Sequence, residues 1–150
     1  MKVRDIMTPE PVCCTPEDTA QKVATMLRDQ DIGSMPVVLD QSSRKLAGVI
    51  TDRDLCCSVV AHGLNPAQTK IDRIFSVHPI TCRDGENIAA CEQLMEQHQI
   101  RRIPIVDGEG CCIGIVSQAD LALHEKPEKV SKVVAQVSKP APEAPSSLAA

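Results

Sequence analysis

The amino-acid sequence contains one pattern twice, and this internal repeat limits the fold more than any other feature. Shifted by 68 positions, residues 5–38 align with residues 73–106 without a gap. After a turn that is two residues shorter in the second copy, the offset becomes 66, and Gly48-Val49-Ile50-Thr51 aligns with Gly114-Ile115-Val116-Ser117. One copy is too small to bury a stable core alone. We therefore expect the copies to pack face to face about a pseudo-twofold axis.

Hydrophobic periodicity and capping residues predict the same element order, β-α-β-β-α, in both copies, which is an α/β fold of the α+β type. For the first copy the expected elements are a strand at Val12–Cys14, a helix that begins at Thr15-Pro16-Glu17-Asp18 and ends at Gly33, strands at Met35–Leu39 and Leu46–Ile50, and a helix from Thr51-Asp52. For the second they are a strand near Ile80, a helix carrying Ile88, Cys91, Leu94 and Met95, strands at Ile103–Val106 and Cys112–Val116, and a helix from Ser117.

The predicted organisation has five segments: repeat 1 (1–60), a connecting segment (61–72), repeat 2 (73–125), a short C-terminal helix (126–138) and a disordered tail (139–150). Val130, Val133, Val134 and Val137 would form one stripe of the C-terminal helix. We expect this stripe to pack on the domain, and covering a dimer neighbour is the alternative.

Composition and charge exclude several classes of partner. The chain has one Phe, no Tyr, no Trp and a net charge of −4, which argues against aromatic stacking of bases and against contacts to a phosphate backbone. No run of 18 apolar residues is present, so no membrane span is expected. The N-terminus has no apolar signal core, and a cytoplasmic protein is expected.

The eight cysteines are expected to be core or surface thiols. Three adjacent pairs, Cys13-Cys14, Cys56-Cys57 and Cys111-Cys112, lack the spacing typical of structural zinc. A thiol-based redox or metal sensor remains the alternative. No nucleophile–base arrangement and no phosphate-binding glycine loop is present, so we expect no catalytic residue, no metal site and no enzyme activity.

The most informative motif is G-x-x-[ST]-x-x-D at a predicted strand-to-helix junction, present as Gly48…Thr51…Asp54 and as Gly114…Ser117…Asp120. Glycine permits close approach to the strand, a helix N-terminus suits a phosphate, and an Asp one turn later can accept ribose hydroxyls. Each copy alone could also be a simple helix cap. Two copies at corresponding positions favour a ligand site.

Several segments together resemble the cystathionine β-synthase (CBS) domain family, in its tandem form called a Bateman module. The closest resemblance is to small bacterial stand-alone pairs of the hypoxic-response type. It covers residues 3–124 and rests on Asp5-Ile6-Met7-Thr8, Met35-Pro36-Val37-Val38, Gly48–Asp54, Arg101–Val106 and Gly114–Asp120. The second copy departs from the pattern at Arg73-Ile74-Phe75-Ser76.

The resemblance implies that adenosyl ligands bind in two clefts between the copies, each cleft using residues of both repeats. The first cleft would join Thr51 and Asp54 to Pro79, Ile80, Arg101 and Arg102. The second would join Ser117 and Asp120 to Pro11, Val12, Gly33 and Ser34. Arg101 and Arg102 would then give phosphate-binding cations to the first cleft alone.

These observations predict a regulatory module with no tightly bound cofactor. Members of the family bind AMP, ADP, ATP or S-adenosylmethionine, and some bind NADH. The resemblance implies that this chain binds AMP, ADP, ATP or S-adenosylmethionine as a regulatory ligand and signals by conformational change. A homodimer is expected from the resemblance, and an unidentified protein regulated in trans is possible. The rivals are a redox or metal sensor and a structural interaction module on the same scaffold.

Overall fold

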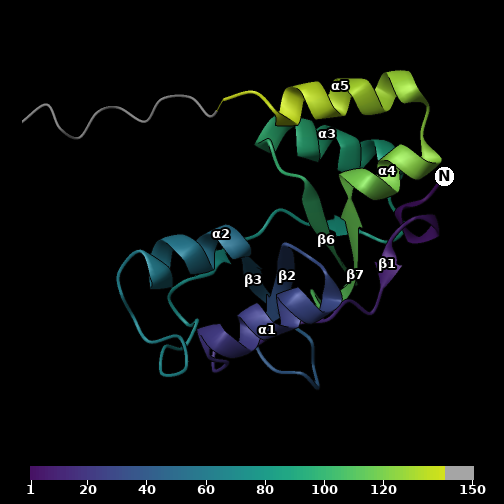
Figure 1. The fold of residues 1–150 in the computed structure, drawn as a ribbon. Coiled ribbons are helices and arrows are strands. Elements are labelled where there is room, and N and C mark those ends of the chain that lie inside the picture. The colour runs from purple at the N-terminus through teal and green to yellow at the C-terminus, as the bar shows by residue number, and fades with distance from the viewer. Residues whose placement is uncertain (141–150) are drawn as a thin grey trace, which may run out of the picture.

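The computed structural model describes residues 1–140 and contains the repeat as two similar halves, drawn in the lower and upper parts of Figure 1. Repeat 1 supplies α1 (Ala20–Gln30), β2 (Ser34–Val38), β3 (Leu46–Thr51) and α2 (Asp52–Leu55), which continues as the short π-helix η2 (Cys56–Val60). Repeat 2 supplies β5 (Cys82–Arg83), α3 (Ile88–His98), β6 (Arg102–Val106), β7 (Cys112–Ser117) and α4 (Gln118–His124). The remaining elements are η1 (Val3–Asp5), β1 (Thr8–Pro9), β4 (Ser76–Val77) and α5 (Pro127–Val137). None of the described helices is long and apolar enough to cross a bilayer.

The first helix starts four residues later than its strongest capping signal predicts. Residues 15–18 form a turn in which Asp18 Oδ2 accepts the Thr15 N–H at 2.9 Å. Thr19 is the N-cap instead, and its side chain accepts the Lys22 N–H. The predicted helix end at Gly33 is also wrong, because the left-handed residue that closes the helix is Asp31, with φ 52°.

The first predicted strand of each copy is shorter than expected. Val12–Cys14 contributes only an isolated bridge, from Cys14 to Val37. Its counterpart near Ile80 lies two residues later, as β5, which pairs in parallel with β6. The tail prediction for 139–150 falls mostly outside the described residues.

Short strands cross from each repeat into the sheet of the other. β1, from the start of repeat 1, pairs with β7, giving the order β1-β7-β6-β5. β4, from the start of repeat 2, pairs with β3, giving the order β2-β3-β4. The glycines of the doubled motif lie at these crossings. A Cβ on Gly48 would lie 2.1 Å from Ser76 O, and one on Gly114 would lie 2.4 Å from Met7 Sδ.

This crossing gives the glycines a different role from the one expected. Gly48 and Gly114 must lack a side chain because another segment of the same chain lies against each of them, and not because a ligand does. Met7 and Phe75 occupy equivalent positions in the two repeats and fill the space over these glycines. The exchange of strands ties the repeats together.

Each repeat has its own aliphatic core, and a third cluster lies between them. Val23, Met35 and Ile50 are fully buried in the first core, and Met95, Ile103 and Ile105 in the second. The small third cluster contains Cys13, Val38 and Cys112. The β2–β3 and β6–β7 hairpins also bond to each other, through Leu46 N–H to Gly110 O and Cys112 N–H to Arg44 O.

The C-terminal helix α5 packs on the outer side of α3 and α4, at the top of Figure 1. Val133 and Val137 are buried in the repeat 2 core, whereas Val134 stays 42% exposed. Lys132 Nζ lies 3.6 Å from Glu96 Oε2 and Lys129 Nζ lies 3.3 Å from Glu125 Oε2. Two of the four valines in the predicted stripe, Val133 and Val137, therefore pack on the domain, whereas Val134 faces solvent.

Glu92 lies under α5 and gives a pH-dependent prediction. Only 9% of Glu92 is exposed, and its burial, with the neighbouring charge of Glu125, raises the pKa of its carboxyl. The folded protein thus holds the proton more tightly than the unfolded chain, and ionisation costs stability as pH rises above about 4.3. Glu92→Gln is expected to have a higher thermal midpoint than the wild type at pH 7, and the difference should shrink toward pH ~4.

The neighbouring Glu96 provides the control. Glu96 is paired with Lys132 and also repels Glu92, so Glu96→Gln removes one attraction and one repulsion and should leave the midpoint at pH 7 close to that of the wild type. Lys129 and Lys132 also face Glu92 and partly offset its burial. A Glu92→Gln midpoint that is equal to or below the wild-type value at pH 7 would contradict the prediction.

Candidate functional site

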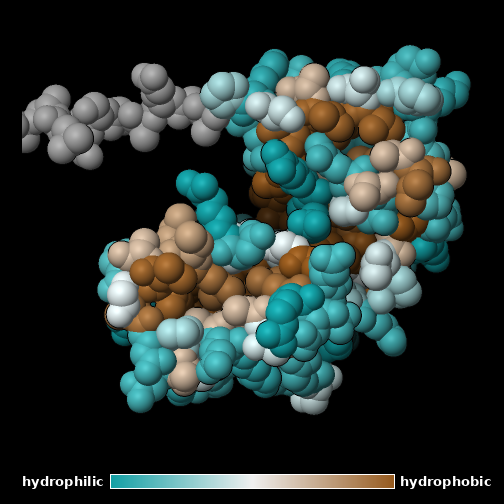
Figure 2. Space-filling view, viewed as in Figure 1, coloured by the Kyte–Doolittle hydropathy of each residue, from teal (hydrophilic) through white to brown (hydrophobic). Residues whose placement is uncertain are grey.

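Two cavities open between the repeats, where the space-filling view shows the molecule hollowed and lined partly by hydrophobic surface (Figure 2). The first has a volume of about 730 Å³ and the second of about 310 Å³. Both are built from equivalent positions of the two repeats. The first cavity is lined by Gly33, Ser34, Val49, Thr51, Asp52, Arg53, Ser76, Val77, His78, Pro79, Ile80, Gln99, Ile100, Arg101, Arg102 and Pro104. The second is lined by Thr8, Glu10, Pro11, Val12, Gln30, Ile32, Ser34, Pro36, Arg102, Ile115, Ser117 and Asp120.

The first cavity, called cleft 1 below, brings together most of the residues predicted for it. Thr51 at the start of α2 lies across from Pro79 and Ile80, and Arg101 and Arg102 enter from the start of β6. Asp54 is not among the residues that line cleft 1. Its carboxylate lies behind Thr51, where it caps the helix.

The second cavity, called cleft 2 below, brings Ser117 and Asp120 together with Pro11, Val12 and Ser34. The placement of Gly33 differs from the prediction. Gly33 lines cleft 1 and not cleft 2, because it lies beside the N-terminus of α2 and its carbonyl accepts the Asp52 N–H at 2.9 Å.

Arg102 also differs from the prediction, because it lines both clefts. Of the two arginines predicted for cleft 1, Arg101 lines that cleft alone. Arg102 is the first residue of β6. Its long side chain reaches repeat 1, where Nη1 donates to Ser34 Oγ at 3.4 Å. The expectation that cleft 2 has no cation is therefore wrong.

Both helix starts in the motif form complete capping boxes. Thr51 Oγ1 accepts the Asp54 N–H at 3.1 Å, and Asp54 Oδ2 accepts the Thr51 N–H at 2.9 Å. In repeat 2, Asp120 Oδ2 accepts both the N–H and the O–H of Ser117 at 2.7 Å. The second oxygen, Oδ1, of each carboxylate makes no hydrogen bond within the described residues. The motif thus serves as a cap and also leaves one carboxylate oxygen available to accept hydroxyl groups.

Equivalent positions carry different charges in the two clefts. Glu10 in cleft 2 corresponds to His78 in cleft 1, and both have left-handed backbones, with φ 47° and 55°. Ser34 corresponds to Arg102 through the offset of 68. Cleft 1 also contains Arg53. Cleft 1 thus has three arginines and one carboxylate, Asp52, whereas cleft 2 has two carboxylates, Glu10 and Asp120, and one arginine among the described lining residues.

Sequence reasoning missed four titratable residues that line the clefts: Glu10, His78, Asp52 and Arg53. The repeat alignment already contained a signal for the first two, because Glu10 and His78 align and each precedes an aligned proline. Arg53 lies two residues after Thr51, within the first helical turn, and local sequence gave no sign that it faces the cleft.

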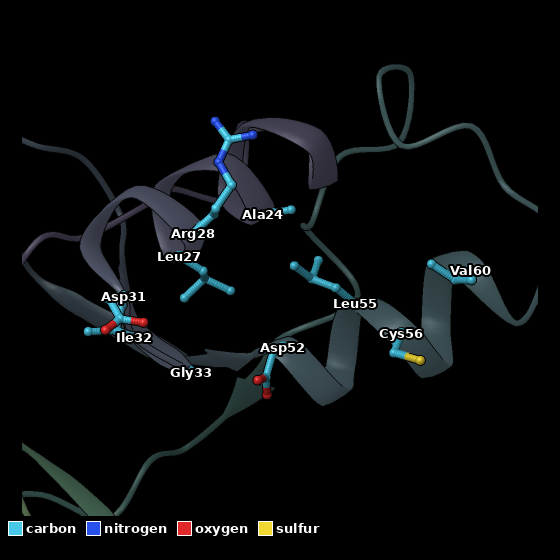
Figure 3. A pocket seen from close by; sticks show the side chains of 10 residues that line it. All are labelled: Ala24, Leu27, Arg28, Asp31, Ile32, Gly33, Asp52, Leu55, Cys56 and Val60. Carbon is cyan, nitrogen blue, oxygen red and sulfur yellow. The ribbon is translucent and has the colours of Figure 1, made fainter.

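A third cavity of about 650 Å³ lies between α1 and α2 of repeat 1 (Figure 3), and it shares Gly33 and Asp52 with cleft 1. Leu27 from α1 and Leu55 from α2 project into it, and Val60 of η2 lies at its rim with 71% of its surface exposed. Arg28 is the one cation among its lining residues in the described chain. In repeat 2, the corresponding face of α3 and α4 is covered by α5.

The cysteines are free thiols in different environments. Cys13, Cys14 and Cys112 are buried, and Cys56 and Cys57 are exposed. Burial raises the pKa of the Cys14 thiol to about 12, which makes it a poor nucleophile at neutral pH. Within residues 1–140, no three His, Cys, Asp or Glu side chains are grouped so that they could hold a metal ion.

Comparisons with known proteins agree with the repeat and with the fold. The family model for the CBS domain matches residues 3–60 and again 71–125. The CBS domain-containing protein YhcV of Bacillus subtilis is 34% identical over 123 residues, which are 82% of this chain and 84% of that protein.

Two solved structures are similar over most of the chain. The structure of Hypoxic Response Protein I, with two coordinated zinc ions, is 30% identical with a TM-score of 0.74, covering 84% of this chain and 100% of that one. The CBS domain pair of protein MJ0100, in complex with 5′-methylthioadenosine and S-adenosyl-L-methionine, is 25% identical with a TM-score of 0.72. The match covers 82% of this chain and 94% of that one.

Proposed function

This chain belongs to the CBS domain family, and from that premise we propose that it is a non-catalytic sensor that binds adenosine-containing ligands between its repeats. The observation that carries the proposal is the pair of inter-repeat clefts, each lined by the N-cap residue of a capping box, Thr51 in cleft 1 and Ser117 in cleft 2. The capping carboxylate Asp120 also lines cleft 2, whereas Asp54 lies behind Thr51. A helix N-terminus favours a phosphate, and the free carboxylate oxygen favours ribose hydroxyls.

The residues proposed to bind the ligand follow from the cleft geometry. Thr51, Pro79, Ile80 and Arg101 would contact a ligand in cleft 1, with Asp54 behind Thr51. Ser117, Asp120, Pro11, Val12 and Ser34 would contact a ligand in cleft 2. Aliphatic and proline side chains on both sides of each cleft would hold the adenine ring, because the chain has a single aromatic residue.

The charge of cleft 1 favours phosphorylated ligands over S-adenosylmethionine. Arg53, Arg101 and Arg102 line cleft 1, and guanidinium groups bind phosphates through two parallel hydrogen bonds. The sulfonium of S-adenosylmethionine is itself a cation and would be repelled there. The likeness to the MJ0100 pair supports the adenosyl part of the ligand in either case.

Titration calorimetry of the full chain tests this function, with AMP, ADP, ATP, S-adenosylmethionine, NADH and adenosine as ligands. We expect AMP, ADP or ATP to bind more tightly than adenosine, and added salt to weaken that preference by screening. Absence of binding heat or thermal stabilisation with all of these ligands would reject the proposal. In the proposed function, the bound ligand stabilises one of two cleft geometries. The change in geometry is the signal, which is received by a dimer mate or by a protein regulated in trans.

A thiol or metal sensor is the second candidate, because Hypoxic Response Protein I was solved with zinc. The exposed Cys56 and Cys57 are the thiols most accessible to an oxidant or a metal. Stoichiometric zinc in the purified protein by elemental analysis, or a change of nucleotide affinity on mild oxidation that is lost after Cys56→Ser and Cys57→Ser, would favour this candidate.

We place a homodimer contact on the open face of α1 and α2 in repeat 1, since repeat 2 already covers the same face with α5. Two copies of this partly apolar groove, related by a twofold axis, would form a closed dimer. Val60→Glu, which puts a charge at the rim of that groove, is expected to shift the protein from dimer to monomer in sedimentation experiments at micromolar concentration, with unchanged circular dichroism.

Leu123 provides the matched control for that charge. Leu123 is 80% exposed on α4, outside the groove, so Leu123→Glu should remain dimeric. Monomeric wild type, or a Val60→Glu variant that dimerises as the wild type does, would remove this face from consideration.

A further inference from the structure

The guanidinium of Arg102 lies between the two clefts and belongs to both. Arg102 and Ser34 are the two residues, among those the structure describes, that line cleft 1 and cleft 2 alike. Arg102 Nη1 donates to Ser34 Oγ at 3.4 Å and would lie 3.7 Å from a Cβ placed on Gly33. Ser34 is 6% exposed whereas Arg102 is an exposed residue, so the buried hydroxyl holds one end of a guanidinium that remains open to both clefts.

The repeat explains why these two residues meet. Position 34 aligns with position 102, and equivalent positions of two face-to-face repeats approach each other where the pseudo-twofold axis passes. Arginine at both positions would press two guanidinium groups together, which is unfavourable. Because repeat 1 has serine at this position, only the Arg102 guanidinium lies at the axis, and the Ser34 hydroxyl accepts its hydrogen bond.

The two clefts depend on this guanidinium to different degrees. In cleft 1, Arg53 and Arg101 supply further positive charge. In cleft 2, Arg102 is the one Lys or Arg among the described lining residues, and it stands against Glu10 and Asp120. A phosphate in cleft 2 therefore has no other cation to neutralise it.

We infer that Arg102 is a shared phosphate-binding residue, and that a phosphorylated nucleoside in one cleft weakens binding of a second one in the other. A guanidinium that holds one phosphate by two parallel hydrogen bonds is oriented toward that phosphate and away from the opposite cleft. The coupling is reciprocal, since each ligand lowers the affinity of the other by the same factor. This inference rests on the proposed binding of adenosyl ligands in both clefts.

Blocking one cleft separates such coupling from a simple difference in affinity. Ile80 lines cleft 1 alone, and Ile80→Trp would fill that cleft while leaving cleft 2 intact. In calorimetric titrations, cleft 2 of Ile80→Trp is expected to bind AMP about tenfold more tightly than the second site of the wild type, because Arg102 is then free. Adenosine has no phosphate, so its affinity for cleft 2 should be the same in both proteins.

Arg102→Ala and Arg101→Ala complete the test. In an Arg102→Ala background, Ile80→Trp should no longer change AMP affinity at cleft 2, whereas in an Arg101→Ala background it should still do so. If the wild type binds AMP and folded Ile80→Trp binds AMP at cleft 2 with unchanged affinity, the shared role of Arg102 is wrong. The proposed function would not be affected by that result. Failure of the wild type to bind both AMP and adenosine would overturn the proposed function as well.

Discussion

Gly48→Ala is expected to lower the free energy of unfolding by about 1–3 kcal/mol, a typical cost of forcing an extra methyl group into a close-packed site. The new Cβ would lie 2.1 Å from Ser76 O and 2.5 Å from Phe75 Cδ2. The oxygen belongs to the backbone of β4, so β4 must move away from β3 for the methyl group to fit. Urea denaturation followed by circular dichroism measures the loss.

Two other glycines make this prediction specific. Gly108 has no atom within 4 Å of its ideal Cβ position, so Gly108→Ala should leave stability almost unchanged. At Gly114 the nearest atom is the flexible Met7 side chain, and Gly114→Ala should cost less than Gly48→Ala. Equal stability of Gly48→Ala and Gly108→Ala would show that the β3–β4 crossing is not fixed as described.

Patterns that depend on the repeat were the most predictable from sequence. The β2–β3 and β6–β7 hairpins, and the helix starts at Thr51 and Ser117, lie where alternation and capping place them. Alignment of the copies, with the resemblance to the CBS family, also predicted that Thr51 would meet Pro79 and Ile80 across an interface. Face-to-face packing of equivalent units brings equivalent positions together.

Features set by long-range contacts could not be predicted locally. Thr15 and Thr19 are both suitable N-caps, and the choice of Thr19 accompanies hydrogen bonds from Ala20 N–H to Thr69 O and from Gln21 N–H to Pro66 O. These acceptors belong to the connecting segment, far away in sequence. The exchange of β1 and β4 between sheets depends in the same way on tertiary packing.

The position of Arg102 shows a similar limit within the site. Alignment places its backbone at the start of β6, and the sequence correctly predicts a cation at cleft 1. Its side chain spans the pseudo-twofold axis because Ser34 is small and offers an oxygen. Sequence alignment assigns residues to clefts by backbone position, so it cannot detect a long side chain that lines two clefts.

Loss of the motif carboxylates is expected to have the largest effect on ligand binding. Asp54→Asn with Asp120→Asn keeps an oxygen that can accept the capping N–H of Thr51 or Ser117, but removes the negative charge offered to the ribose. A hydrogen bond to a charged acceptor contributes about 1.5–3 kcal/mol, so AMP affinity should fall roughly tenfold or more at cleft 2, which Asp120 lines, and by less at cleft 1, where Asp54 lies behind Thr51. Calorimetry on the purified double variant measures this fall.

Comparison with alanine separates binding from capping. Asp54→Ala with Asp120→Ala should lose a similar amount of affinity and also about 0.5–2 kcal/mol of stability per helix, because each capping box is broken. Asp40→Asn, at an exposed turn outside both clefts, should bind AMP as the wild type does. If the Asn double variant binds AMP with wild-type affinity, Asp54 and Asp120 act only as helix caps, and the ribose must be held by other groups in the clefts.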